Sequence, residues 1–210
     1  MSIVPVFSAV SEPVTLAFVN NNRDDGNGDS YTYTGLSIGA AATGRYIVVA
    51  VTLGSGTPGT TAVTINGNAM TSIVDASDAT SVAAIFIYKL ETGTTADFVV
   101  SGGTGWDRCS IAIYTAYKVE GTYTSASDNT PSTNVLSVSI SIPAGAAVVA
   151  VEYGDSSNTA TWSGVTENYD VRAERHHSGG ALVYTNGATG QTISVTDDNT
   201  NNVLAVAIIR

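Results

Sequence analysis

Polar and apolar residues alternate along much of the chain with a period of two, which is the pattern of half-buried β-strands. Val138, Ile140 and Ile142 are separated by serines, so one face of this segment is expected to be buried and the other wet. Asn66-Gly67 stands between two strand-like segments and is typical of a tight hairpin turn. No stretch carries an apolar stripe at helical spacing. The pattern therefore predicts an all-β protein with six or seven short strands in each half.

The second half of the chain repeats the first in the same order. Ile47-Val48-Val49-Ala50-Val51 returns almost unchanged as Ala147-Val148-Val149-Ala150-Val151. Further matches follow, and their offset drifts from about 100 to about 94 residues, as changes in loop length produce. These repeats predict two tandem, similar antiparallel β-sandwich units, jelly-roll or Ig-like, preceded by an arm: 1–12 for the arm, 13–118 and 119–210 for the units. Separate sandwiches that share an interface are favoured over two halves of one body, and both alternatives stay open.

Composition limits the partners. Hydrophobic residues make up 43% of the chain, which is enough for a core, and charged residues only 12%, about half the ordinary share. The surface is therefore expected to be mostly Thr, Ser and Asn. The net charge of −10 repels nucleic acid. The first residues resemble no signal peptide, and no segment is long and apolar enough for a membrane span, so we expect synthesis in a cytosol and no membrane insertion.

Catalytic chemistry is weakly represented. Cys109, the single cysteine, lies in a strand-like segment and is expected to be a buried small hydrophobe in preference to a nucleophile. His176 and His177 are adjacent, so in a strand they point to opposite faces and cannot serve one site; a solvated strand end is expected for them. The acidic residues stand mostly at expected loops and strand ends, with no recognisable pair on an apolar strand. No catalytic residue is assigned, and the chain is not expected to be an enzyme.

A metal ion or a sugar are the two ligands that the sequence suggests. Asp25, Asn27 and Asp29 have the alternating oxygen-ligand spacing that opens a calcium loop, but Leu36 stands where the twelfth-position Glu is needed. A polar connection without metal is the favoured alternative, so no cofactor is expected. Four aromatic residues near expected strand ends are candidates for stacking on a glycan, with core or interface packing as the favoured alternative: Trp106, Tyr153, Trp162 and Tyr169.

The N-terminal arm is apolar, although it has no counterpart in the second unit. Ile3, Val4, Val6 and Phe7 are its candidate partner-binding residues. They are expected either to pack along a neighbouring subunit or capsid surface, by adding a strand or filling a groove, or to cover one end of their own sandwich. The first alternative implies a homo-oligomer, with a trimer as the natural symmetry for a fibre.

Three segments, 35–39, 44–51 and 63–70, together resemble β-sandwich structural proteins encoded by tailed bacteriophages, especially aquatic ones. The resemblance covers most of the chain, is one of pattern, and carries no catalytic motif. It implies a virion component that works with other capsid or tail proteins: a capsid decoration protein, or a head or tail fibre. A carbohydrate- or receptor-binding adhesion module is the alternative reading of the residues, and a glycan hydrolase is a remote one. Head or tail position and the receptor stay open.

Overall fold

The computed structural model describes residues 12–130, 133–155, 158–173, 175–197 and 202–210. The arm residues Ile3, Val4, Val6 and Phe7 lie outside the described part of the chain. Seventeen β-strands make up the regular structure of the described residues, and no helix among them is long and apolar enough to cross a membrane. The predicted all-β fold class is confirmed.

The first sandwich is formed by two antiparallel sheets. The inner sheet has the strand order β1-β9-β3-β7-β6 and the outer sheet the order β2-β8-β4-β5. The inner strands are β1 (Thr15–Asp24), β9 (Arg108–Tyr117), β3 (Tyr46–Gly54), β7 (Ser81–Lys89) and β6 (Thr71–Ser77). The outer strands are β2 (Gly28–Ser37), β8 (Thr95–Trp106), β4 (Thr57–Ile65) and β5 (Asn68–Ala69).

The second sandwich repeats this topology, except that the short edge strand β5 has no counterpart. Its inner sheet has the order β10-β17-β12-β15-β14 and its outer sheet the order β11-β16-β13. The inner strands are β10 (Tyr123–Asp128), β17 (Asn202–Ile209), β12 (Ala146–Gly154), β15 (Arg175–Tyr184) and β14 (Thr166–Ala173), and the outer ones β11 (Val135–Ile142), β16 (Ala188–Thr196) and β13 (Thr161–Ser163). The predicted pair of tandem, similar antiparallel sandwiches is therefore confirmed.

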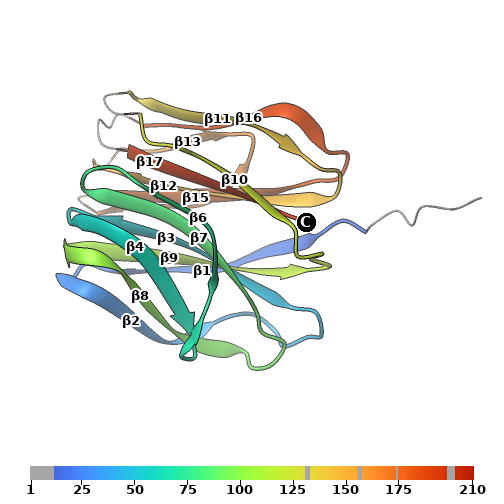
Figure 1. The fold of residues 1–210 in the computed structure, drawn as a ribbon, viewed down its shortest axis with the longest axis horizontal. Helices are drawn as coiled ribbons and strands as arrows, with labels where there is room; N and C mark the ends of the chain where they lie inside the picture. The colour runs from blue at the N-terminus through green and yellow to red at the C-terminus, as the bar shows by residue number, and fades with distance from the viewer. Residues whose placement is uncertain (1–11, 131–132, 156–157, 174, 198–201) are drawn as a thin grey trace, which may run out of the picture.

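The two inner sheets pack face to face, so that the molecule is a stack of four sheets (Figure 1). Three apolar layers fill the spaces between the sheets. One lies inside the first sandwich, one inside the second, and the middle one between the two inner sheets. The sandwiches are thus separate in topology but joined through the middle layer.

Burial on both faces explains the continuous apolar runs of the inner strands. Along β3, Val49 and Val51 point into the first sandwich, whereas Val48 and Ala50 point into the middle layer. A strand that is covered on both sides has no wet face and therefore shows no polar alternation. The outer strands keep the alternation, and in β11 the exposed Ser137 separates the buried Leu136 from the buried Val138.

The sequence match between the two inner strands is one residue out of register with the structure. Gly44 and Gly145 both have φ of 75°, and the amides of Arg45 and Ala146, the residues that follow them, each donate to the carbonyl three residues earlier. Alignment on these turns makes Val149 the equivalent of Val48, and both side chains lie in the middle layer. The matched letters would instead pair Val48 with Val148, which points into the second sandwich. A slip by one residue exchanges the faces of a strand.

The stacking of the two halves is reciprocal. Strand β1 of the first sandwich is equivalent to β10 of the second, and β6 is equivalent to β14. β10 packs against β6, and β1 meets β14 through the stacked rings of Phe18 and Tyr169, whose centroids are 5.9 Å apart. The contact between β1 and β14 is therefore the counterpart of the contact between β10 and β6. Two identical subunits related by a twofold axis make such paired contacts in an isologous dimer, and here they occur within one chain.

Gly54 allows a close approach between the inner sheets. A Cβ atom at this position would lie 2.2 Å from the Cε2 and hydroxyl oxygen of Tyr153 across the interface. We expect Gly54→Ala to lower the free energy of unfolding by about 1–3 kcal/mol, the usual cost of overpacking. In a Tyr153→Ala background the same change should cost much less, because the clashing ring is gone. Denaturant unfolding of the four proteins measures this coupling, and equal costs in both backgrounds would contradict the close approach.

Arg45 closes one end of the first sandwich from inside. Its guanidinium is fully buried and donates to backbone carbonyls of two loops, including Leu90 O at 2.7 Å, Ala40 O at 2.7 Å and Thr92 O at 2.8 Å. Ala146 occupies the equivalent position in the second sandwich.

We expect Arg45→Met to destabilise the protein by about 3 kcal/mol or more, because several buried carbonyls would lose their donors at once. The matched control is Lys89→Met, which removes an exposed cation near the same loop and should cost at most about 1 kcal/mol. Thermal and denaturant unfolding of both variants provide the comparison. Similar losses in the two variants would show that Arg45 does not hold these loops.

Candidate functional site: a buried carboxylate–histidine cluster

A cluster of three ionisable side chains is buried at one end of the second sandwich. Glu152 comes from β12, His176 from β15, and Asp197 follows β16 directly. His176 Nδ1 lies 3.2 Å from Glu152 Oε2 and 3.5 Å from Asp197 Oδ2. One ligand atom from each residue lies within 4.8 Å of the other two. Three segments that are distant in the sequence thus direct their polar atoms at one point.

Strand alternation explains why these side chains point inward. Val148 and Ala150 of β12 face the interior of the second sandwich, and Glu152 is the next residue on that face. His176 and His177 point to opposite faces, as predicted: His176 to the cluster, and His177 to the inter-sandwich layer, where its Nδ1 lies 2.5 Å from Thr52 Oγ1. The expectation that they are solvated is wrong, because both are fully buried.

Additional polar contacts orient the cluster. His176 Nε2 lies 2.6 Å from Asp170 Oδ1 on β14, and Asp170 also makes an ion pair of 3.3 Å with Arg172 Nε. Asn202 Nδ2 donates to Asp197 Oδ1 at 2.7 Å. With Asp170 as its partner, Nε2 of a neutral His176 carries the proton, and the Nδ1 lone pair then points at Glu152 and Asp197.

Burial shifts the ionisation of the cluster. Desolvation raises the pKa of Glu152 to about 8, although the neighbouring His176 opposes the shift. Desolvation alone would lower the pKa of His176, but contacts with Asp197 and Glu152 outweigh it and raise the pKa to about 10. For His177 burial prevails, and its pKa falls well below the usual value.

Polar atoms in this interior are left without hydrogen bonds. Within the described part of the chain, the two carboxylate oxygens of Glu152 lack a hydrogen-bond partner of good geometry. The Nδ1 atom of His176 lacks one as well. Asn202 Oδ1 is in the same condition. Buried polar atoms normally have partners, and each exception calls for an explanation.

The first sandwich has no such cluster in the equivalent place. Leu53 of β3 is equivalent to Gly154 of β12. Gly154 pairs with His176 and Asn202, and Leu53 pairs with Val82 and Cys109, which are therefore the equivalents of those two residues. The equivalent of Glu152 is Val51. Val51, Val82 and Cys109 all belong to the apolar core of the first sandwich. The fold therefore does not require polar residues at these positions.

The sequence did not reveal this site. The acidic residues are expected mostly at loops and strand ends, whereas Glu152 lies within β12 and is brought close to Asp197 across the sandwich. Glu152 and Asp197 thus form an acidic pair that the sequence did not show, although only Glu152 lies on an apolar strand. One signal was available: a Glu at the end of the run Ala-Ala-Val-Val-Ala-Val, on the side that faces the core.

The four candidate glycan-binding aromatics divide into two groups. Trp106 is fully buried in the core of the first sandwich, and Tyr153 is buried edge-on against His177 at 5.2 Å. A sugar cannot reach either ring, so the packing alternative is correct for these two. Trp162 is half-buried and donates to Ser178 Oγ at 2.5 Å, and Tyr169 is half-buried against Phe18. Glycan binding at Trp162 and Tyr169 stays a prediction.

The candidate calcium residues lie in and beside the short β1–β2 connection. Asp25 forms an ion pair with Arg23, and Asp29 Oδ1 accepts from the amide of Gly105 at 2.7 Å. Asn27 is exposed. Two of the three side chains thus have protein partners in this structure, and calcium binding at Asp25, Asn27 and Asp29 stays a prediction.

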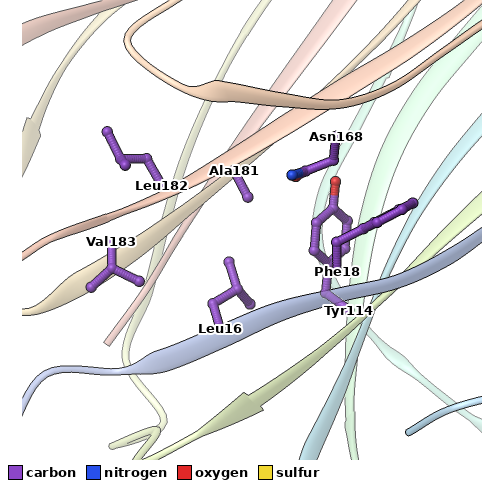
Figure 2. A pocket seen from close by; sticks show the side chains of 7 residues that line it. All are labelled: Leu16, Phe18, Tyr114, Asn168, Ala181, Leu182 and Val183. Carbon is purple, nitrogen blue, oxygen red and sulfur yellow. The ribbon is translucent and has the colours of Figure 1, made fainter.

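A pocket of about 200 Å³ opens where the two inner sheets meet, beside β1 and β14–β15 (Figure 2). Leu16, Phe18 and Tyr114 line it from the first sandwich, opposite Asn168 and three apolar residues of β15. Asn168 is the extra residue of a β-bulge, and its Oδ1 atom is buried without a hydrogen bond. The pocket is a gap at the edge of the middle layer, and six of its seven lining residues are aliphatic or aromatic.

Known proteins resemble this chain only weakly. No protein-family model matches the chain, and no curated protein matches it. Solved structures to which it is similar include the PBSX exported protein XepA (10% identity, 93% of this chain, 86% of that chain, TM-score 0.28) and the STIV MCP (9%, 93% and 96%, TM-score 0.30). The Sputnik virophage structure is another (8%, 100% and 87%, TM-score 0.21). Scores this low carry no argument about function.

Cys109 is fully buried in the first core, as predicted, and burial raises the pKa of its thiol to about 12. We expect no reaction with a disulfide reagent at mildly alkaline pH while the protein is folded, and one equivalent in concentrated guanidinium chloride. A Cys109→Ser/Ser72→Cys variant, with its thiol on the exposed side of β6, should react at once without denaturant. Rapid labelling of native Cys109 would contradict its placement in the core.

Proposed function

We propose that this chain is a structural component of a tailed-phage virion, displayed on the particle surface as a capsid decoration protein or as part of a head or tail fibre. The supporting observation is the way the chain distributes its side chains. Apolar residues are concentrated in three stacked layers, and the outer faces of the stack carry hydroxyl groups. On β11 these are Ser137, Ser139 and Ser141, and on β2 they include Thr32 and Thr34, all of them exposed.

Such a body suits a passive, durable role. Four stacked sheets with two-sided burial of the inner strands form a rigid block whose surface has few charges to desolvate against a neighbour. The inner sheets end in the edge strands β1, β6, β10 and β14, whose unpaired backbone groups are available for pairing with another protein. The partners in this proposal are other capsid or tail proteins.

Charge favours the outside of a particle over its interior. The net charge of −10 disfavours contact with a packaged genome and suits a surface that faces solvent. The resemblance to phage structural proteins, noted from segments 35–39, 44–51 and 63–70, points the same way. Self-association, with a trimer for a fibre, belongs to the same proposal.

Gold-labelled antibody imaging of purified particles is the direct test. Particles from lysates of cells that produce this chain would be separated on a density gradient, imaged with labelled antibody, and measured for the copy number of the chain by mass spectrometry. We expect the chain in the particle fraction, with label at regular sites on the head or tail. Recovery of the chain only as free protein, with unlabelled particles, would overturn the proposal.

A further inference from the structure

We propose that Glu152, His176 and Asp197 bind a single divalent transition-metal ion of the zinc class, which locks one end of the second sandwich. This inference is independent of the virion role. It rests on the convergence of the three side chains, on their burial, and on the hydrogen-bonding atoms that lack partners there.

The spacing of the three groups fits a small ion. His176 Nδ1 is 3.2 Å from Glu152 Oε2 and 3.5 Å from Asp197 Oδ2. Ligands bound tetrahedrally at zinc distances of about 2.0–2.1 Å lie roughly 3.3 Å from one another. The side chains of Glu152 and His176 are fully buried and that of Asp197 almost so, so their orientation is set by packing.

The donor atoms select the class of metal. One imidazole nitrogen with two carboxylates suits zinc and its first-row neighbours, whereas calcium and magnesium prefer oxygen ligands alone. Asp170, bonded to the far nitrogen of His176 at 2.6 Å, completes the carboxylate–histidine–metal arrangement that orients ligating histidines. Asn202 orients Asp197 in the same way, through its bond of 2.7 Å.

Comparison with the first sandwich argues against a purely structural role for the bare cluster. There the equivalents of Glu152, His176 and Asn202 are Val51, Val82 and Cys109, which pack as an ordinary core. Apolar residues usually serve stability at least as well as buried charges. A divalent ion would neutralise both carboxylates, coordinate the Glu152 oxygens and the His176 Nδ1 atom that lack hydrogen bonds, and tie β12 and β15 to the end of β16.

Zinc binding to the full chain tests the proposal. The protein would be treated with chelator, dialysed against micromolar ZnCl₂, desalted, and measured for bound zinc by plasma mass spectrometry. Replacement of zinc by Co²⁺ would add the visible absorption of a four-coordinate site. We expect one zinc per chain and a higher Tm with zinc present.

Three variants make the result specific. Glu152→Val/His176→Val copies the first sandwich and should fold but bind no zinc. Asp170→Asn keeps the three ligands and should weaken zinc binding by about 10–100-fold, the usual effect of losing such an orienting partner. Asp25→Asn/Asp29→Asn removes two surface carboxylates from the β1–β2 connection and should bind as the unchanged protein does.

Two results would overturn the site. One is the absence of stoichiometric zinc in the unchanged protein, which would mean that the cluster is joined by shared protons without a metal ion. The other is undiminished binding in Glu152→Val/His176→Val or, should that variant not fold, in Asp170→Asn. Neither result bears on particle association, so this proposal and the virion role fail separately.

Discussion

The contact between the two inner sheets is the constraint on which the rest of the structure depends. It covers the second face of β3, β7 and β9 on one side and of β12, β15 and β17 on the other, so the central strands must be apolar on both faces. It also demands small groups where the backbones come close, as at Gly54 beneath the ring of Tyr153. The two sandwiches are thereby joined into one four-layer body.

Outside this shared layer the two halves have diverged. The first sandwich closes one end with the buried guanidinium of Arg45 and fills the other with Val51, Val82 and Cys109. The second has Ala146 at the first of these places and, at the other, the cluster around His176. The common fold requires neither device, so each half carries its own means of fixing loops and strand ends. Among the described residues, it is the second half that brings a histidine and two carboxylates together in its interior.

Period-two alternation and the internal repeat were enough to predict the fold class and the paired sandwiches, because both are local or linear properties of the sequence. The one-residue slip between Val48 and Val149 was not predictable, since Val-Val-Ala-Val reads equally well in either register and only the turns at Gly44 and Gly145 fix it. The cluster of Glu152, His176 and Asp197 escaped notice because its members meet only through sheet pairing and stacking. Burial of Trp106 depended on the same long-range packing.

The joining of the sandwiches can be measured directly, because each contains one tryptophan: Trp106 in the first and Trp162 in the second. Trp162→Phe and Trp106→Phe variants each leave a fluorescent reporter in one sandwich, to be followed through denaturant unfolding beside the circular dichroism of the whole sheet structure. If the middle layer joins the halves into one cooperative unit, fluorescence and circular dichroism should change together in both variants. A tryptophan transition clearly separated from that of the sheets, in either variant, would contradict the account.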